Sequence, residues 1–496
     1  MHSALSQKRR LSIATLGSMR GEIARPAFRL GRPRGGIVHL GIGAFHRAHQ
    51  AVYTDDALAA GDEGWGITAV SLRSPAVRDL MVPQDNLYTV MERSGQRAAM
   101  RVIGAVEAVY AARENPAAVL AALASPTTHI VTLTVTEKGY CRQAGSNQLD
   151  YAQAAQPGTI YTVLAAGLAQ RKAAGCGGVT LVSCDNLPGN GHLLAELLAE
   201  YLERDNPSLA AWTARHVACP DTVVDRIVPA VTRAEIDALA ERTGLIDRAM
   251  VVTEPFRQWV IQNRFAGPRP RWEAGGAQFV DNVHAFETAK LRLLNGSHST
   301  LAYFGIGLGF DFVHEAVADP ALNSMVQIQM MKEAAPCLPR SADLDPGAYG
   351  DALLRRFANP ALDHRLKQIA MDGSQKIPQR WLATMIERDK AGQGSAAHML
   401  SLAAWAVHTR GRSANGASYK VDDPLADRLR DLWREAGSDI DRLAGLFIDK
   451  SGVFPTEFGI SSRLRQAFPA ALRSILECGW RPALDAFLSW HEGQID

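Results

Sequence analysis

The sequence predicts an α/β domain built on a parallel sheet, followed by a mostly α-helical domain. Three observations support this prediction. Apolar, β-rich segments alternate with helical segments between residues 36 and 203. A glycine-containing turn follows the first strand directly, and strand signals largely disappear beyond about residue 285. Together they indicate a Rossmann-type N-terminal domain and a helical C-terminal domain.

Five short apolar segments are predicted to be strands, at 37–40, 66–72, 101–106, 129–135 and 179–183. Helices are predicted at 116–124, 161–174 and 192–203. Strands that are apolar throughout and separated by helices are typical of a parallel sheet with both faces covered. The sheet domain therefore continues well past residue 180.

The second half of the chain has helical spacing or composition. Helices are predicted at 286–308, 323–333, 349–357, 397–410, 424–436 and 467–476. Proline and glycine punctuate 265–276, which predicts a connecting loop ahead of the boundary. We therefore expect three parts: an arm at 1–35, a dinucleotide-binding domain at 36–285 and a helical substrate and catalytic domain at 286–496.

Composition excludes several classes of protein. The 53 basic and 51 acidic side chains leave a net charge of +2, which argues against nucleic acid as a partner. Hydrophobic residues make up 47% of the chain, so a sizeable core is expected. The six cysteines form no C-x-x-C pair, and no apolar run approaches the ~20 residues of a membrane span. These features predict a protein of the reducing cytoplasm with no membrane partner.

The first 35 residues are strongly basic. They hold eight lysines and arginines against one acid, a local charge of +7, while the rest of the chain is at −5. The arm is open to interpretation as an organellar transit peptide, as an anion-binding tail, or as an extension that wraps a folded domain. We favour the extension and assign the arm no chemistry.

The first predicted strand runs into Gly41-Ile42-Gly43-Ala44-Phe45-His46, and a helix is expected to follow. Gly41 permits a tight turn, and Gly43 lets the backbone approach a phosphate at the N-terminus of the helix. An isolated G-x-G is also compatible with an ordinary glycine turn, but its place after a strand favours cofactor binding. The predicted cofactor-binding residues of this turn are Gly41, Ile42, Gly43, Ala44 and Phe45.

Two features depart from the usual dinucleotide fingerprint. His46 replaces the third glycine, so the helix and the strand should pack less closely. The second strand is followed by Arg73 where an acid would bind the ribose, and an arginine there can stack on adenine or contact a 2′-phosphate. NAD is expected, and NADP remains open. His46 and His49 have no cluster of acids or cysteines nearby, so we predict a structural or phosphate-adjacent role for them and no metal site.

The segment Lys290-Leu291-Arg292-Leu293-Leu294-Asn295-Gly296-Ser297-His298 carries the candidate catalytic groups. At about 100° per residue, Lys290, His298 and Asn295 project at about 0°, 80° and 140° on a helix. A chance scatter of polar residues on a half-buried helix would give the same pattern. A desolvated lysine is nevertheless a competent acid or base, and an Asn/His pair can hydrogen-bond an oxygen that gains charge.

These motifs resemble the polyol-specific long-chain dehydrogenases, the mannitol dehydrogenase family. The resemblance covers nearly the whole chain after the arm, and it rests on ordered matches at 41–50, 134–140, 183–186, 224–227, 254–259, 290–298 and 372–376. It implies a dinucleotide-binding domain, a helical domain, an active site between them and metal-independent hydride transfer. It further implies that a monomer is plausible.

The resemblance also assigns roles to residues. Lys290 is the implied acid and base, and Asn295 and His298 polarise the reacting carbonyl. The implied ligands of the substrate hydroxyls are Asn186, Asp225 and Lys376. Each has a structural alternative: Asn186 as a turn cap, Asp225 as a partner of Arg226, and Lys376 as a solvated side chain. Glu137 and Glu287 are candidate proton-path or gating acids, with a helix-surface role equally open for Glu287. Cys184 has no identifiable partner base, so no nucleophilic role is expected.

Within the family the sequence is most similar to the fructuronate reductase branch, and this similarity lies in the amino-acid sequences of segments 134–141, 295–298 and 371–380. Mannitol-oxidising relatives tend to carry alanine at the position of Gly296 and arginine at that of Gln368. A uronate carboxylate needs a cation, and Arg380 can provide a bidentate partner unless it is a surface salt-bridge residue.

The expected function is therefore NAD-dependent, reversible reduction of D-fructuronate to D-mannonate, with Lys290 as general acid and base. The first alternative is a mannitol or arabinitol type of polyol 2-dehydrogenase. The second is a non-catalytic nucleotide-sensing protein whose basic arm recruits a partner. Turnover that depends on Lys290 separates an enzyme from a binding protein, and a substrate panel separates the two enzymes.

Overall fold

The computed structural model describes residues 9–32, 34–95, 97–143, 146–412, 416 and 418–493. The chain divides into two compact units, Met1–Val283 and His284–Asp496, which are described separately below. A search of the described residues finds no helix with the length and hydropathy of a transmembrane span.

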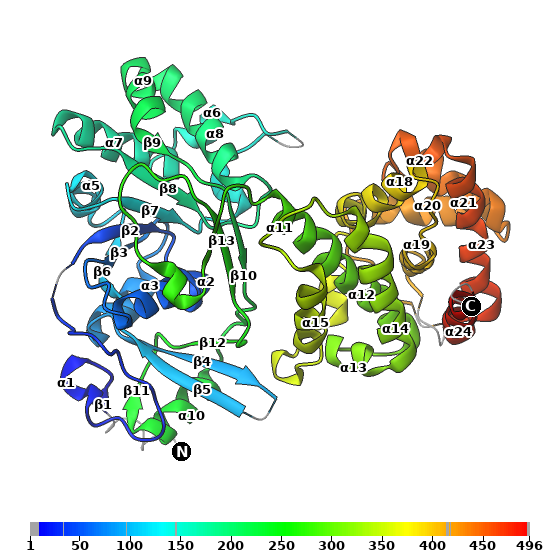
Figure 1. The fold of residues 1–496 in the computed structure, drawn as a ribbon, viewed down its shortest axis with the longest axis horizontal. Helices are drawn as coiled ribbons and strands as arrows, with labels where there is room; N and C mark the ends of the chain where they lie inside the picture. Colours follow the sequence, from blue (N-terminus) through cyan, green and yellow to red (C-terminus); the bar gives the residue numbers. More distant parts are fainter. Residues whose placement is uncertain are drawn as a thin grey trace. The chain divides into compact units, whose positions relative to one another are not determined.

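Unit 1 is built on a six-stranded parallel sheet (Figure 1). Numbered along the chain within this sheet, the spatial order of its strands is 3-2-1-4-5-6, which is the Rossmann order. This topology confirms the predicted fold class. In spatial order the strands are β6 (Val106–Ala111), β3 (Gly66–Ser71), β2 (Gly36–Leu40), β7 (Ile130–Leu133), β8 (Val179–Ser183) and β9 (Val217–Ala218).

Helices cover both faces of this sheet because the buried side chains of each strand alternate between two cores. Within β2, Ile37 belongs to one hydrophobic core, and Val38 and Leu40 belong to the other. The first core includes residues of α3 (Gln50–Ala59). The second includes residues of the helices α5 (Pro116–Ala124), α7 (Ile160–Ala173) and α8 (Asn190–Asp205).

The predicted single strand at 101–106 is wrong. The chain forms β5 (Arg97–Ile103) there, antiparallel to β4 (Tyr88–Ser94), and then enters the main sheet as β6. Gly104 lies between the two strands, and its N–H donates to the buried Asp55 carboxylate at 2.8 Å. A Cβ at Gly104 would lie 2.5 Å from a methyl carbon of Leu30. The Leu30 side chain of the arm thus packs closely against Gly104 at the point where the chain changes sheets.

Strands outside the main sheet were not predicted. They lie in small sheets that join β12 (Val251–Thr253) to β4, and β10 (Thr222–Asp225) to β13 (Gln258–Gln262) and β14 (Gln278–Val280). Their residues mix polar and apolar types over three to five positions, so no period stands out.

The described part of the basic arm packs on unit 1. Strand β1 (Arg9–Arg10) pairs with β11 (Leu245–Ile246), and Leu11, Leu16 and Met19 form a buried cluster with residues of the unit. Residues 1–8, which include Lys8, lie outside the described residues.

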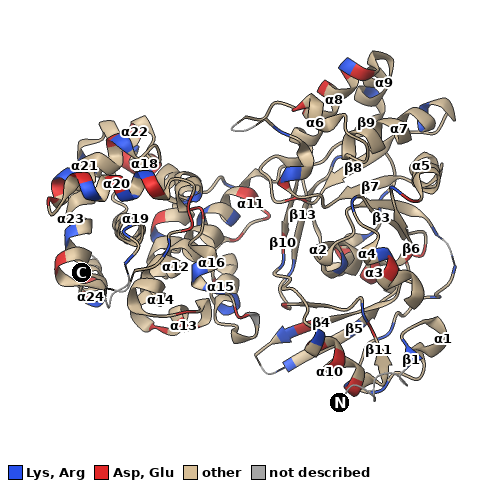
Figure 2. Ribbon diagram, turned by 180° about the vertical axis from the view of Figure 1, so that it is seen from behind, with Lys and Arg blue, Asp and Glu red and all other residues tan. Residues whose placement is uncertain are grey.

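Unit 2 is helical around α12 (Gly296–Leu308) and α19 (Ala396–His408), in which almost every residue is buried. Ion pairs join the exposed faces of three further helices, and Figure 2 shows their mixed charge. Such exposed pairs stabilise a fold only slightly. The other long helices of the unit are α14 (Pro320–Ile328), α15 (Pro346–Phe357), α18 (Ala383–Lys390), α20 (Ala426–Ala436), α21 (Ile440–Lys450), α23 (Ser462–Cys478) and α24 (Trp480–Glu492).

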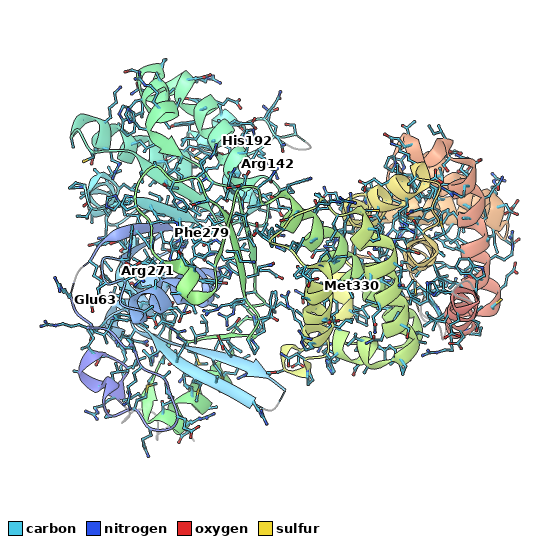
Figure 3. The ribbon with its side chains drawn as sticks, viewed as in Figure 1. Glu63, Arg142, His192, Arg271, Phe279 and Met330 are labelled. Atoms are coloured by element: carbon cyan, nitrogen blue, oxygen red, sulfur yellow. The ribbon has the colours of Figure 1, made fainter. Side chains whose placement is uncertain are left out.

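Three helical stretches of unit 2 contain a π segment. These are η4 (Lys290–Asn295), η5 (Gln329–Ala334) and η8 (Pro378–Leu382), and at the end of each a backbone N–H bonds the carbonyl five residues earlier. Met330 of η5, labelled in Figure 3, is fully buried. The predicted helix at 286–308 exists as α11 (His284–Ala289), η4 and α12. The expectation of a regular α-helix was wrong for its central segment, η4, which is a π turn.

Candidate functional site

The glycine turn lies in unit 1, at the carboxyl end of β2. Strand order reverses between β2 and β7, where ligands bind in sheets of this topology. Gly41 has a φ of 101°, and a Cβ there would lie 2.2 Å from the Thr134 carbonyl oxygen. Gly43 begins α2 (Ala44–Ala48) and has room for a Cβ, since its nearest neighbour would be 3.8 Å away.

This turn fits a bound pyrophosphate. Within the described residues, the backbone N–H groups of Gly43, Ala44 and Phe45 have no acceptor in the protein. Unpaired N–H groups at the start of a helix bind anions. Ile42, by contrast, is buried and donates its N–H to Val70 of β3 at 3.2 Å, so it anchors the turn.

The two histidines of the turn, His46 and His49, are buried. His46 stacks on His39 of β2 with ring centroids 3.3 Å apart, so imidazole rings fill the space that a third glycine would leave between strand and helix. His49 hydrogen-bonds the Gln258 carbonyl oxygen at 2.8 Å. Burial lowers the pKa of His49 and of His39 to about 3. A search of the described chain finds no cluster of three or more potential metal ligands.

Arg73 follows β3 and is exposed. No hydrogen bond or ion pair of its side chain occurs with the part of the chain that the structure describes. The cofactor role of Arg73 stays a prediction.

The sequence interpretation missed Asp185, which follows β8. Its buried carboxylate accepts the N–H groups of Val135 and Thr136 at 3.1 and 2.7 Å, and the Tyr140 hydroxyl at 3.1 Å. Thr136 has a φ of 65°, a strained conformation for a β-branched residue. Asp185 thus holds the loop after β7 in place. The signal was present, because the matched run 183–186 contains this acid.

Residues that follow β7 line a pocket of about 660 Å³. Glu137, a predicted gating acid, lines this pocket together with Lys138 and Arg142. Cys184 is buried, and burial raises the pKa of its thiol well above the usual range. A raised pKa disfavours the thiolate, so the structure agrees that Cys184 is no nucleophile.

Asn186 and Asp225 occupy the ends of strands in unit 1. Asn186 is exposed after β8, and Asp225 is the last residue of β10 and is 9% exposed. The alternative in which Asp225 pairs with Arg226 is wrong, because the Arg226 guanidinium pairs with Glu92 and donates to the carbonyl of Glu254. Both substrate-binding roles stay predictions.

The candidate catalytic segment lies in unit 2, on the π turn η4. Lys290 is its first residue, and the Gly296 N–H bonds the Leu291 carbonyl five residues earlier. A π turn contains one residue more than an α turn, so the eight positions from Lys290 to His298 rotate about the helix axis as seven positions of an α-helix would. The angle between the two side chains about the axis is therefore about −20° instead of 80°. The helix therefore places Lys290 and His298 on nearly the same face. Lys290 and Asn295 are half-buried.

His298 is 8% exposed and lies against aromatic rings. Its ring centroid is 4.5 Å from that of Phe357 and 5.2 Å from that of His364. Burial, together with the nearby His364 and the guanidinium groups of Arg356 and Arg380, lowers the pKa of His298 well below 6.5. His298 is therefore neutral at pH 7 and can donate one N–H while taking no part as an acid. His364 and Phe357 were not predicted, since no sequence spacing links them to His298.

Arg380 and Lys376 lie in the same unit as the catalytic segment. Arg380 Nη1 donates to the Asn295 carbonyl oxygen at 3.2 Å and to Ser299 Oγ at 2.8 Å. Lys376 Nζ donates to the Met371 carbonyl oxygen at 2.5 Å. Both side chains are half-buried, so the solvated alternative for Lys376 and the surface salt-bridge alternative for Arg380 are wrong.

Neither cation forms an ion pair with the part of the chain that the structure describes, although the more distant carboxylates of Asp372 and Asp423 raise the pKa of Lys376. Among the described residues, no carboxylate lies within 4.0 Å of the charged nitrogens of Lys376 or Arg380. Burial lowers the pKa of Arg380 to about 10, and burial and the adjacent Arg380 lower that of Lys376. A positive charge in this environment is stabilised by a bound anion.

Lys376 lies in the short helix α17 (Gly373–Ile377) and not in the loop that the sequence suggests, and the start of this helix is hydrogen-bonded to Asp423. Asp423 accepts the Ser374 N–H at 2.8 Å and the Ser374 hydroxyl at 2.6 Å. Gly373 packs so closely that a Cβ would lie 2.5 Å from the Tyr303 hydroxyl and 2.6 Å from Trp405 Nε1. These contacts fix the position of the lysine backbone.

Comparisons with known proteins agree with this geometry. Residues 35–274 match the mannitol dehydrogenase Rossmann domain, and residues 282–475 match the mannitol dehydrogenase C-terminal domain. D-mannonate oxidoreductase of Escherichia coli K12 is 39% identical over 94% of this chain and 98% of its own length. Mannitol 2-dehydrogenase of Phaeosphaeria nodorum is 37% identical over 90% of this chain and 82% of its own length.

A solved structure has the same fold over nearly the whole chain. The ternary complex of Pseudomonas fluorescens mannitol 2-dehydrogenase with NAD and D-mannitol superimposes with a TM-score of 0.79 at 35% identity. The similarity covers 97% of this chain and 99% of that one.

Proposed function

The chain belongs to the mannitol dehydrogenase family of oxidoreductases, and we propose that it reversibly reduces D-fructuronate to D-mannonate with a nicotinamide cofactor, NAD being expected. The observation that carries this proposal is the pair of half-buried cations in unit 2. A sugar acid supplies an anion that can pair directly with Lys376 and Arg380, and a neutral polyol does not. The similarity to a D-mannonate oxidoreductase supports the same substrate class.

Arg380 is the better candidate for the substrate carboxylate. One of its terminal nitrogens is used by Asn295 and Ser299, and no hydrogen bond of the other to the described chain is found. Guanidinium groups bind carboxylates through paired N–H donors. Lys376, four residues earlier, adds a second positive charge or a donor for a hydroxyl group. Asn186 and Asp225 are proposed to orient the remaining hydroxyls.

Each catalytic side chain has a distinct task. In oxidation, the neutral Lys290 amine accepts the proton of the substrate hydroxyl while the C–H bond electrons leave as hydride; in reduction, the ammonium returns that proton. The Asn295 amide and the neutral His298 imidazole donate hydrogen bonds to the reacting oxygen. Because His298 holds no exchangeable charge at pH 7, Lys290 alone sets the proton balance.

The cofactor is assigned to unit 1 on the fit of its glycine turn. Gly43, Ala44 and Phe45 would hold the pyrophosphate through their unpaired N–H groups, and Arg73 would contact the adenosine end. The bound nicotinamide supplies the hydride acceptor in oxidation and the donor in reduction.

The substrate panel tests this proposal. We expect purified protein to oxidise D-mannonate with a much higher kcat/KM than D-mannitol or arabinitol, each measured with NAD and with NADP. Arg380→Met should lower kcat/KM for mannonate about 100-fold, since a hydrogen bond between charged groups contributes about 1.5–3 kcal/mol. The ratio of mannonate to mannitol activity should therefore fall.

Two outcomes would reject the sugar-acid assignment. One is faster turnover of mannitol than of mannonate by the unaltered protein, which would place it with the polyol 2-dehydrogenases that are 36–37% identical. The other is an unchanged ratio of the two activities in Arg380→Met. Arg434→Met is the control, because Arg434 pairs with Asp431 at 2.9 Å on an exposed face of α20 in the same unit.

A further inference from the structure

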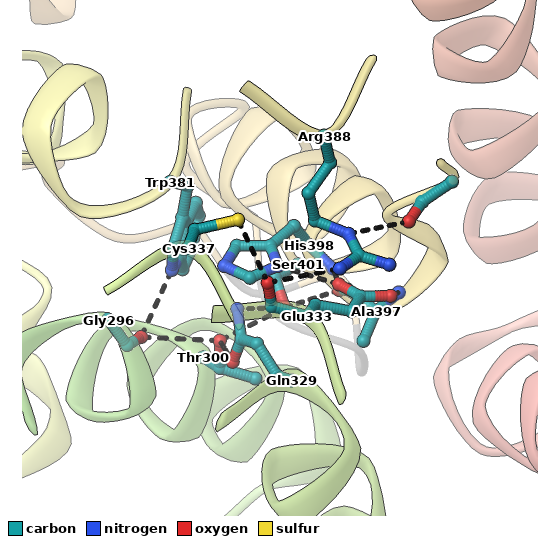
Figure 4. Close-up of polar contacts among 11 residues, drawn as sticks. Gly296, Thr300, Gln329, Glu333, Cys337, Trp381, Arg388, Ala397, His398 and Ser401 are labelled. Carbon is teal, nitrogen blue, oxygen red and sulfur yellow. Dashed lines mark hydrogen bonds and ion pairs between the residues drawn. The ribbon is translucent and has the colours of Figure 1, made fainter. Parts of the chain in front are cut away.

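The catalytic π turn is held from one side by the neighbouring π segment η8. Two successive residues of η8 bind two successive carbonyls at the end of η4: Arg380 binds Asn295, and Trp381 Nε1 donates to the Gly296 carbonyl oxygen at 3.1 Å. Trp381 is fully buried, so this indole N–H depends on that single protein acceptor. Figure 4 shows the contact beside a buried polar network.

Two side-chain donors, Trp381 and Thr300, lie near the Gly296 carbonyl oxygen, and only Trp381 has its proton available for it. The Thr300 hydroxyl also lies 3.3 Å from the Gly296 carbonyl oxygen, but it lies 2.6 Å from Gln329 Oε1. A hydroxyl has one proton, and the shorter contact takes it. Ser401, 3.0 Å from the Thr300 hydroxyl, has its own acceptor in the Ala397 carbonyl oxygen at 2.8 Å. The side-chain proton on the Gly296 carbonyl is therefore that of Trp381.

The far side of this network is fixed by a buried acid. Glu333 of η5 accepts the N–H groups of Ala397 and His398 at 2.9 and 3.0 Å, and His398 Nδ1 lies 2.6 Å from its carboxylate. Glu333 thus holds the start of α19, and Gln329 of the same π segment bonds Thr300 of α12. Hydrogen bonds through Gln329 and Glu333 of η5 therefore connect α12, which carries His298, to the start of α19 (Figure 4).

We propose that Trp381 is a positioning residue, which acts through its hydrogen bond to the Gly296 carbonyl to keep η4 as a π turn and so holds Lys290 and His298 on one face. A π turn is rare because its hydrogen-bond geometry is poorer than that of an α-helix, so external partners must stabilise it. This inference deepens the proposed function and rests on the catalytic role assigned there to Lys290.

The test replaces Trp381 by Phe, which removes the donor and keeps a buried ring. The matched control is Trp433→Phe, since the Trp433 indole donates to Thr409 Oγ1 at 3.0 Å in the same unit. Trp381→Phe should lower kcat at least about 10-fold, because small misplacements of reacting groups slow the reaction. It should also shift the pH dependence of kcat, since Lys290 is the proposed acid and base. The Kd of the cofactor, and the pH profile of Trp433→Phe, should stay unchanged.

Assays use whichever of D-mannonate and D-mannitol the unaltered protein oxidises faster, so failure of the sugar-acid assignment leaves this test intact. If Trp381→Phe does not fold, Trp381→Met, which has no side-chain N–H or O–H donor, takes its place with the same expected result. The proposal is overturned if the Trp381 variant keeps the wild-type pH profile and a kcat within twofold of the Trp433 variant.

Discussion

At the scale of single residues, the turn after β2 needs a residue without a side chain at Gly41. Gly41 was predicted from its place after a strand, and its φ of 101° and the contact with Thr134 show why glycine is needed. Asp185 and Trp381 were not singled out. Their roles depend on backbone groups far away in the sequence, at Val135 and Gly296, and no spacing within the sequence indicates such pairs.

The two glycines of the turn should respond differently to alanine. Gly41→Ala should destabilise unit 1 or abolish its folding, because the new Cβ would meet the Thr134 carbonyl oxygen at 2.2 Å. Gly43→Ala should fold with nearly wild-type stability, because the space beside Gly43 is open. It should nevertheless weaken NAD binding at least about tenfold, since the methyl group would occupy the place of a phosphate.

Calorimetric titration with NAD and urea unfolding of both variants would check these effects. Wild-type NAD affinity in a folded Gly43→Ala variant would show that the pyrophosphate does not approach this turn.

At the scale of elements, period and composition predicted the strands of the main sheet and the long helices. They failed where an element is shared between sheets or departs from standard geometry. The chain leaves β5 and enters β6 at Gly104, where the Leu30 side chain and the Asp55 carboxylate contact it, and local sequence does not reveal these contacts. The π turn at η4 is likewise fixed by Arg380 and Trp381, nearly ninety positions along the chain. The face predicted for His298 on a regular α-helix was wrong for this reason.

At the scale of the whole molecule, buried histidines make stability depend on pH. Burial lowers the pKa of His39 and His49 to about 3 and that of His46 well below 6.5, while the unfolded chain titrates near 6.5. Below pH 6.5 the unfolded state therefore binds protons that the folded unit 1 excludes. Stability should be lost as pH falls from about 6.5, by up to about 4 kcal/mol per pH unit for three histidines.

Urea unfolding between about pH 7 and pH 5 would measure this slope. His46→Asn should reduce the number of protons taken up on unfolding by about one, and the slope of the free energy of unfolding against pH should fall accordingly. His192→Asn should leave it unchanged, because the His192 side chain is 70% exposed. A free energy of unfolding that stays constant over this range would contradict the assigned protonation states.

The family and fold of the molecule could be predicted from its sequence because several motifs recur in order along nearly the whole chain. The sequence favoured a sugar acid over a polyol and named Arg380 as a cation for its carboxylate. The three-dimensional contacts add that Arg380 and Lys376 form no ion pair among the described residues.

The most direct test of the central claim is the turnover of Lys290→Ala. We expect this variant to bind NAD like the unaltered protein but to oxidise D-mannonate about 10²- to 10⁴-fold more slowly, the usual contribution of a general acid or base. Lys367→Ala, which alters an exposed lysine of the same unit, should be fully active. Turnover of Lys290→Ala within a few-fold of the unaltered protein would contradict the account.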